Sequence, residues 1–311
     1  MWELADLSQS GSDGHSQPER SVIANGPLAG RAINDVIAQF GEQLLGRLSL
    51  SHDGEFPLLV KYLDARETLS IQVHPDLPYL AQHPEAHLKS EAWYILDAPP
   101  GAVVYRGLRE GVTPAQLLAA VEAKDEAKLK AMLIQVPVKA GDCLYIPLGT
   151  LHALGAGLLV LEVQTPSDTT FRVYDWGRPR MTEAQRQWHL EQAMQCITFG
   201  PPRVKHVEKR SHVAGFFTTV SSLIKCDHFH LEKVRMTEGY EQEIPYDQPA
   251  VWIVLQGRGR IAGGASRPVV EFQKGETLLV PANMNDAKVT LAEDTIWLEV
   301  TFPQAKTPEL E

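Results

Sequence analysis

The sequence, 311 residues long, has few cysteines, no excess of basic residues and no long apolar run. Its three cysteines, Cys143, Cys196 and Cys226, stand far apart without a CxxC pair, which argues against a zinc ribbon and predicts reduced thiols. The formal net charge of -10 and the lack of a basic stripe argue against a general nucleic-acid partner. A few converging Arg and Lys side chains could still bind a small anionic substrate.

Membrane and export signals are also missing from the sequence. No apolar stretch is long enough to cross a bilayer. The polar, acidic N-terminus lacks the basic and apolar regions of a signal peptide. The sequence therefore predicts a cytoplasmic protein without a membrane partner.

Short strand-like runs separated by turn residues make up most of the chain. The 23 glycines and 21 prolines favour many turns, as in a β-rich fold. Helical spacing is confined to residues 33–45, to an excursion at about 113–133, and to residues 182–197. We therefore predict a mainly β protein with a short helical insertion and a helical linker. Its expected domains are residues 1–200 and 201–311.

An internal repeat indicates that these two domains are related. Residues 141–152 and 275–286 share a glycine and a proline at the same spacing, and an apolar run beginning with tryptophan precedes each segment. The second copy has Asp286 where the first has His152, and nothing ionisable where Glu91 would fall. The repeat predicts a duplication in which the second domain is degenerate and lacks a metal site.

Polar side chains alternate along two predicted strands of the first domain. Ser70, Gln72 and His74 share one face, because side chains two residues apart on a strand point the same way. Lys89 and Glu91 share a face of the next strand in the same manner. Since the interior of a filled β-barrel is normally apolar, a polar interior face predicts a ligand cavity.

A metal site is one interpretation of this cavity. His152 follows a proline–glycine turn that can direct its imidazole into the mouth of a barrel. With His74, Glu91 and the amide oxygen of Gln72 it makes a reasonable ligand set for Zn²⁺ or another divalent first-row metal. From these residues alone, buried structural histidines are the competing interpretation.

The motifs resemble a known family. The spacing Gly-x5-Pro-x-Gly-x2-His in residues 141–152 is that of the second cupin motif. The first cupin motif normally has His-x-His followed by Glu, and here it is Gln72-x-His74 followed by Glu91. In this variant the sequence resembles the type I phosphomannose isomerases, most closely their short bacterial form. The resemblance runs from Trp2 to about Ile197 and continues more weakly beyond. It implies two cupin (jelly-roll-like) β-barrels.

The same resemblance implies roles for individual residues. One Zn²⁺ per chain would be held by Gln72, His74, Glu91 and His152. Arg172 corresponds to the catalytic arginine of the family, and Lys89 is a second residue with an implied catalytic role. The residues implied to contact the substrate are Ser70, Lys89, Asp168 and Arg178. Asp168 could instead form an Asx turn, and Arg178 stands where many members have a lysine.

The implied activity is the metal-dependent interconversion of mannose 6-phosphate and fructose 6-phosphate through an enediol. The partner would be a small anionic sugar phosphate, and the protein a monomer or homodimer. The general acid–base is left open among Lys89, Glu162, Asp168 and a metal-bound water. The alternatives are a non-catalytic sugar-phosphate-binding cupin and an iron cupin oxygenase, which Gln72 in place of a histidine disfavours.

Overall fold

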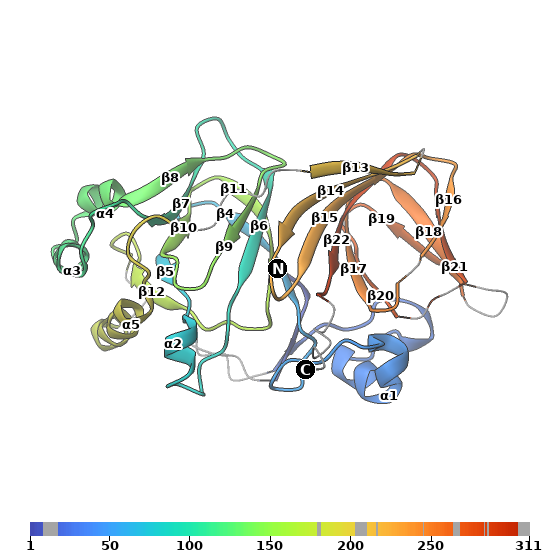
Figure 1. Ribbon diagram of the computed structural model, residues 1–311, viewed down its shortest axis with the longest axis horizontal. Helices are drawn as coiled ribbons and strands as arrows, with labels where there is room; N and C mark the ends of the chain where they lie inside the picture. The colour runs from blue at the N-terminus through green and yellow to red at the C-terminus, as the bar shows by residue number, and fades with distance from the viewer. Residues whose placement is uncertain are drawn as a thin grey trace, which may run out of the picture. The chain divides into compact units, whose positions relative to one another are not determined.

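The computed structural model describes residues 1–8, 18–178, 182–202, 210–215, 217–244, 246–263, 268–282, 284 and 286–303 (Figure 1). The chain divides into two compact units. Unit 1 consists of Met1–Glu19 and Phe56–His206, and unit 2 of Arg20–Glu55 and Val207–Glu311. Both units are built mainly from β-strands, as the sequence predicts.

Unit 1 contains two five-stranded antiparallel sheets. Sheet 1 has the strand order β1 (Trp2–Leu4), β4 (Leu59–Ala65), β11 (Leu158–Gln164), β6 (Glu91–Asp97) and β9 (Cys143–Ile146). Sheet 2 has the order β12 (Phe171–Tyr174), β5 (Ile71–Val73), β10 (His152–Leu154), β7 (Val103–Leu108) and β8 (Leu133–Pro137). A short two-stranded ladder is formed by β2 (Asp6–Leu7) and β3 (Glu19–Arg20).

An apolar core fills part of the space between sheets 1 and 2. Trp93 and Val160 of sheet 1 pack in one cluster with Val104 and Leu154 of sheet 2. Among the described strands, no ladder joins the edges of the two sheets. They form two facing antiparallel layers, as the predicted jelly-roll-like fold requires, and the described strands do not close a barrel.

Helices pack against the other face of sheet 2. They are α2 (Leu77–Leu80), α3 (Pro114–Glu122), α4 (Glu126–Met132) and α5 (Glu183–Cys196). Thr113 and Thr182 begin α3 and α5 with capping boxes, and Asp125 caps α4, so the excursion at 113–133 is confirmed. Cys196 of α5 is buried in the same apolar cluster as sheet 2 residues such as Ile71. The predicted linker helix is therefore a packed part of unit 1.

Unit 2 contains a six-stranded and a four-stranded antiparallel sheet. Sheet 3 has the order β13 (Arg210–Gly215), β14 (Thr218–Lys225), β15 (His230–Met236), β22 (Thr295–Thr301), β17 (Ala250–Gln256) and β20 (Thr277–Val280). Sheet 4 has the order β16 (Glu241–Glu243), β21 (Ala287–Leu291), β18 (Arg258–Gly263) and β19 (Val270–Gln273). Trp252 and Trp297 of sheet 3 share an apolar core with Phe272 and Val289 of sheet 4.

Residues 20–55 group with unit 2, whereas the sequence predicts a first domain of residues 1–200. They contain η1 (Gly26–Leu28) and α1 (Ile33–Leu45), and α1 has the predicted bounds. After α1, the backbone at Gly46 lies so close to the rest of unit 2 that a Cβ there would be 2.4 Å from the carbonyl oxygen of Asp247. Helical spacing in the sequence predicts α1 but cannot show which core its apolar face will join.

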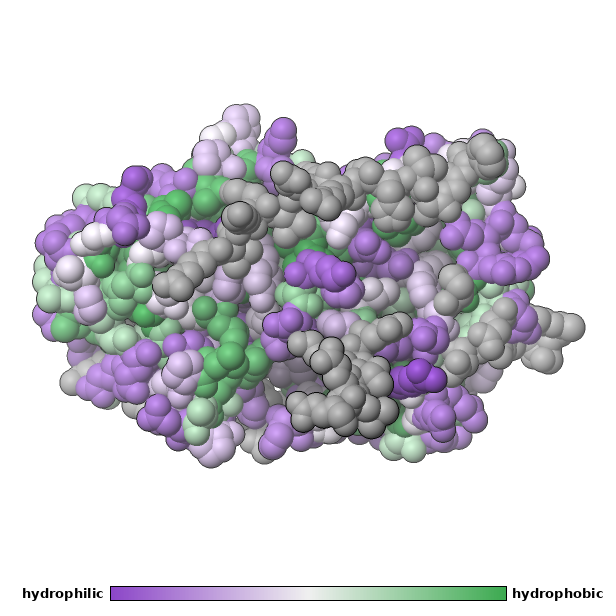
Figure 2. Space-filling model, viewed as in Figure 1, coloured by the Kyte–Doolittle hydropathy of each residue, from purple (hydrophilic) through white to green (hydrophobic). Residues whose placement is uncertain are grey.

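Polar side chains are frequent on the face of the molecule drawn in Figure 2. Hydrophilic residues cover much of the described surface drawn in Figure 2, with apolar side chains in separate patches between them. Among the described helices, none combines the length and the hydropathy needed to cross a membrane.

Candidate metal centre

A row of polar side chains crosses sheet 2 on its interior face. The strand register pairs Arg172 with Gln72, Gln72 with His152, and His152 with Arg106. Directly paired residues of antiparallel strands point to the same side of the sheet, so these four side chains form one row. Ala153, the residue after His152, belongs instead to the apolar cluster on the helix-covered face. The row therefore projects into the space between sheets 1 and 2.

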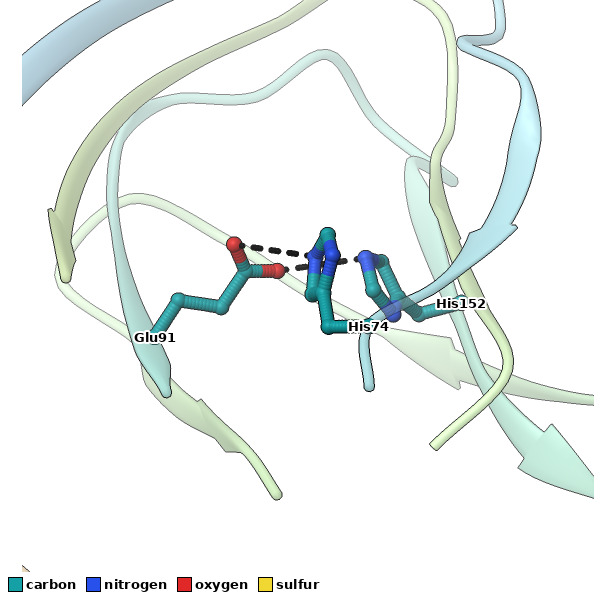
Figure 3. A group of neighbouring side chains, drawn as sticks. All are labelled: His74, Glu91 and His152. Atoms are coloured by element: carbon teal, nitrogen blue, oxygen red, sulfur yellow. Dashed lines mark ion pairs between the residues drawn. The ribbon is translucent and has the colours of Figure 1, made fainter. Parts of the chain in front are cut away.

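Glu91 of sheet 1 meets two histidines of this interior (Figure 3). Its Oε1 lies 3.1 Å from His152 Nε2, and its Oε2 lies 3.4 Å from His74 Nε2. All three side chains are 2% exposed or less. Their ligand atoms lie within 4.8 Å of one another, and no other such group of His, Cys, Asp or Glu occurs in the described part of the chain. The arrangement can hold one cation between the two sheets.

Backbone carbonyls fix the orientation of both imidazoles. His74 Nδ1 lies 3.0 Å from the carbonyl oxygen of Thr169, and His152 Nδ1 lies 2.8 Å from that of Thr150. A carbonyl only accepts, so each Nδ1 carries the proton and each Nε2 keeps its lone pair. Such contacts to the second nitrogen are typical of metal-ligating histidines. Both lone pairs are thereby directed at Glu91.

The charges around Glu91 fit a divalent metal. Both carboxylate oxygens are buried without a hydrogen bond, although Lys89 Nζ lies 2.8 Å from Oε2. Burial alone would raise the pKa of Glu91, but Lys89 and His74 hold it well below its ordinary value. Burial and Lys89 lower the pKa of His74 to about 3. An ionised carboxylate and neutral imidazoles are the protonation states in which these groups bind metals.

The amide of Gln72 lies at the edge of this group. Its Nε2 is 3.2 Å from His152 Nε2, and its Oε1 accepts from the Ser70 hydroxyl at 3.4 Å. Rotation of the amide by half a turn would present the oxygen to His152 and to a cation beside it. Gln72 can therefore serve as a fourth ligand, as the resemblance implies.

Gly149 explains the spacing of the second cupin motif. It has a φ of +72°, and a Cβ at this position would lie 2.7 Å from the carbonyl oxygen of Cys196 and 2.8 Å from the Thr198 hydroxyl. Its N–H donates to the carbonyl of His74 (3.3 Å), and its own carbonyl accepts from the Thr198 N–H (2.8 Å). This turn joins the two histidine strands to the end of α5. Only glycine fits there without displacing one of them.

A second charged group lies on sheet 1. The register aligns Lys61, Glu162 and Trp93 across β4, β11 and β6. Trp93 Nε1 donates to Glu162 Oε2 (3.2 Å), while Glu162 Oε1 lies 3.9 Å from Lys61 Nζ and 3.8 Å from Lys89 Nζ. Glu162 therefore stands between two buried amines.

The two amines differ in their pKa. Burial lowers the pKa of Lys61, despite the opposing charge of Glu162. Burial acts the same way on Lys89, but Glu91 and Glu162 outweigh it and raise the pKa of that amine. Lys61 is not among the site residues predicted from the sequence. The available signal was a single lysine within the strand-like run of residues 57–63, which is otherwise mostly apolar.

Asp168 lies near the two amines, in the loop that leads into β12. Its carboxylate contributes to raising the pKa of Lys89, which places it within electrostatic range. The hydroxyl of the preceding Ser167 accepts from the Thr169 N–H (3.1 Å) and helps to shape the loop. The structure thus brings Asp168 towards the charged group on sheet 1.

Arg178 is engaged by acidic neighbours. Its Nη1 donates to Glu67 Oε2 (2.7 Å), and its Nη2 donates to Asp175 Oδ1 (2.8 Å) and to the carbonyl of Thr68 (2.6 Å). These contacts satisfy both ends of its guanidinium fork. A substrate phosphate at Arg178 would have to compete with two carboxylates.

Comparison with known proteins places these residues in a family. Residues 12–100 match the model of the phosphomannose isomerase type I catalytic domain, a stretch that contains Gln72, His74 and Glu91. The chain is 36% identical over 263 residues to a mannose-6-phosphate isomerase of Streptococcus mutans, covering 84% of this chain and 78% of that protein. It is 33% identical over 275 residues to the Bacillus subtilis mannose-6-phosphate isomerase ManA, covering 88% and 83%.

Solved structures share the fold along the whole chain. The crystal structure of the mannose 6-phosphate isomerase from Bacillus subtilis superposes with a TM-score of 0.78 at 26% identity, covering 97% of this chain and 98% of that one. A putative mannosephosphate isomerase from Archaeoglobus fulgidus, 19% identical, has the same fold with a TM-score of 0.68. The similarity therefore extends over both units.

Proposed function

The chain belongs to the type I phosphomannose isomerase family, and from this premise we propose that it interconverts mannose 6-phosphate and fructose 6-phosphate between sheets 1 and 2. The observation that supports this most directly is the buried group of Glu91, His74 and His152, whose ligand atoms all lie within 4.8 Å of one another. Such a group is costly to bury unless a cation completes it.

We propose that the resident metal is zinc, one ion per chain, with Gln72 as the fourth ligand. Two imidazoles, a carboxylate and an amide oxygen form a set that zinc accepts in catalytic sites. When bound, the ion supplies Lewis-acid polarisation of the substrate carbonyl and stabilises negative charge that develops on oxygen.

The charged groups around the metal centre would carry out the proton transfers and stabilise the enediolate. Isomerisation moves one proton between C1 and C2 of the sugar and another between the two oxygens. Lys61, Glu162 and Lys89 form a connected group of two amines and a carboxylate, which supports its assignment to these proton transfers. Lys89 with its raised pKa would remain a cationic donor, whereas Lys61 with its lowered pKa reaches the neutral form more easily. Arg172 would stabilise the enediolate, because its charge is permanent.

The activity is tested by incubating the zinc-loaded protein with mannose 6-phosphate and following fructose 6-phosphate in a coupled assay. Turnover that chelation removes and added metal restores would support the proposal. Elemental analysis should find about one zinc per chain. Binding of mannose 6-phosphate without turnover would contradict it and favour a non-catalytic sugar-phosphate-binding protein.

A further inference from the structure

Arg106 on β7 is a buried cation that the proposed reaction does not use. Its side chain is 7% exposed, and its Nε is buried without a hydrogen-bond partner. Burial alone lowers its pKa, with no carboxylate close enough to oppose this. Among the described residues, no ion pair or aromatic ring compensates its charge, whereas Arg178 is held by Glu67 and Asp175.

The strand register places Arg106 on the interior face of sheet 2, beside His152. It pairs directly with His152, so both side chains leave sheet 2 on the same face, from strands roughly 4.8 Å apart. Val104, two residues earlier on β7, points the same way into the core between the sheets. Arg106 and Arg172 therefore stand at opposite ends of the row whose middle members are Gln72 and His152.

An uncompensated guanidinium in such a place indicates an anionic ligand. A buried charge is costly unless it is paired, and a guanidinium does not relieve that cost by losing its proton. The substrate class carries a phosphate with a charge of about -1.5 to -2 near neutral pH, as phosphate monoesters do. Arginine matches phosphate oxygens with two parallel hydrogen bonds.

We propose that Arg106 binds the phosphate of the sugar phosphate inside the metal cavity and so selects phosphorylated over free sugars. This inference rests on the proposed function and assigns to Arg106 a substrate contact of the kind that the family resemblance implies for Arg178. Arg106 acts on binding: its contact with the phosphate is the same in the ground state and in the transition state. Its removal therefore raises KM and leaves kcat nearly unchanged.

The test compares Arg106→Met, Arg106→Lys and Arg178→Met with the wild-type enzyme, and uses Arg66→Met as a surface control because Arg66 is 88% exposed. We expect Arg106→Met to raise KM for mannose 6-phosphate by about 10- to 100-fold, the loss typical of a hydrogen-bonded charge pair. Arg106→Lys should recover part of it, since it keeps the charge without the fork. A KM increase in Arg178→Met and not in Arg106→Met would overturn the proposal. A loss of kcat at unchanged KM in Arg106→Met would also overturn it and point to the enediolate.

Binding provides a second readout that does not depend on turnover. Titration calorimetry of the metal-free proteins with inorganic phosphate should show weaker binding in Arg106→Met than in wild type and Arg66→Met. Equal affinities would overturn the proposal. Thermal unfolding of each variant shows whether it is folded. If Arg106→Met does not fold, the same comparison is made with Arg106→Lys. If the wild-type enzyme binds phosphate through Arg106 but does not turn over mannose 6-phosphate, the proposed function fails while Arg106 keeps its role.

Discussion

The interiors of the two units share a framework and differ in charge. In unit 1, Glu162 on β11 pairs across the strands with Trp93 on β6, and in unit 2, Glu299 on β22 pairs with Trp252 on β17. Both glutamates are buried and accept from an indole N–H: Trp93 donates to Glu162, and Trp297 donates to Glu299 at 3.2 Å. A buried carboxylate paired across the strands with a tryptophan is thus common to both units.

The neighbours of this carboxylate differ between the units. Glu162 lies within 4 Å of two amines, whereas the other partner of Glu299 is the neutral hydroxyl of Tyr246, at 2.5 Å. Burial raises the pKa of Glu299 because no cation opposes it. Two residues before the tryptophan, unit 2 has Ala250 in its apolar core where unit 1 has Glu91. Unit 1 thus has charged side chains at positions where unit 2 has neutral or apolar ones.

The largest effect is expected from a substitution in the metal centre. Glu91→Gln removes the charge that balances the cation, so zinc content should fall and kcat/KM should drop on the order of 1,000-fold or more. Elemental analysis and the coupled assay measure both. Glu299→Gln is the matched carboxyl-to-amide control in unit 2 and should leave zinc content and kcat/KM within about twofold. Full activity in Glu91→Gln would refute the assignment of the centre.

The next largest effect is expected at Glu162, the unit 1 carboxylate that corresponds to Glu299 in unit 2. Glu162→Gln should lower kcat by about 100- to 10,000-fold with zinc content unchanged, because in the proposed reaction Glu162 belongs to the proton-transfer group and is not a metal ligand. The measurement is kcat together with zinc content for the same preparation. A variant that loses zinc in proportion to activity would assign Glu162 to metal binding instead.

Local sequence patterns predict most residues of the metal centre. The residues that they do not predict are brought to the site by pairing between distant strands. Alternation identifies Gln72 and His74, and the cupin spacing identifies His152 through the turn at Gly149, since both are properties of contiguous residues. Lys61 and Arg106 cannot be identified in this way, because each is brought to the site by pairing with a distant strand. Lys61 pairs with Glu162, about 100 residues away along the chain, and Arg106 pairs with His152, about 46 residues away. The assignment of residues 20–55 to unit 2 depends likewise on non-local packing, which no periodicity encodes.

Gly149→Ala should have a smaller, structural effect. The new Cβ would have a strained φ and meet the Cys196 carbonyl, which we expect to cost about 2–4 kcal/mol of unfolding free energy and to weaken zinc binding. Gly275→Ala in unit 2 is the control, because its φ is also positive but no atom lies within 4 Å of its Cβ position. It should cost only about 1 kcal/mol. Urea unfolding of both variants measures the difference, and equal losses would show that the turn contact at Gly149 is unimportant.

The smallest expected effect is on how the free energy of unfolding depends on pH. One buried group in each unit contributes to this dependence, and the two contributions have opposite signs. In the metal-free protein His74 has a pKa of about 3 against an ordinary 6.5, so only the unfolded chain takes up this proton as the pH falls between those values. His74 therefore lowers the stability of the fold with falling pH, by up to about 1.4 kcal/mol per pH unit. Glu299 has a raised pKa, so the folded chain holds its proton more tightly, and this contribution is lost as the pH rises above 4.5. Urea unfolding between pH 4.5 and 6.5 should thus show a shallower rise of stability with pH in His74→Gln and a steeper one in Glu299→Gln. If the slope of unfolding free energy against pH changed in the same direction in both variants, the contrast between the charged interior of unit 1 and the interior of unit 2 would be contradicted.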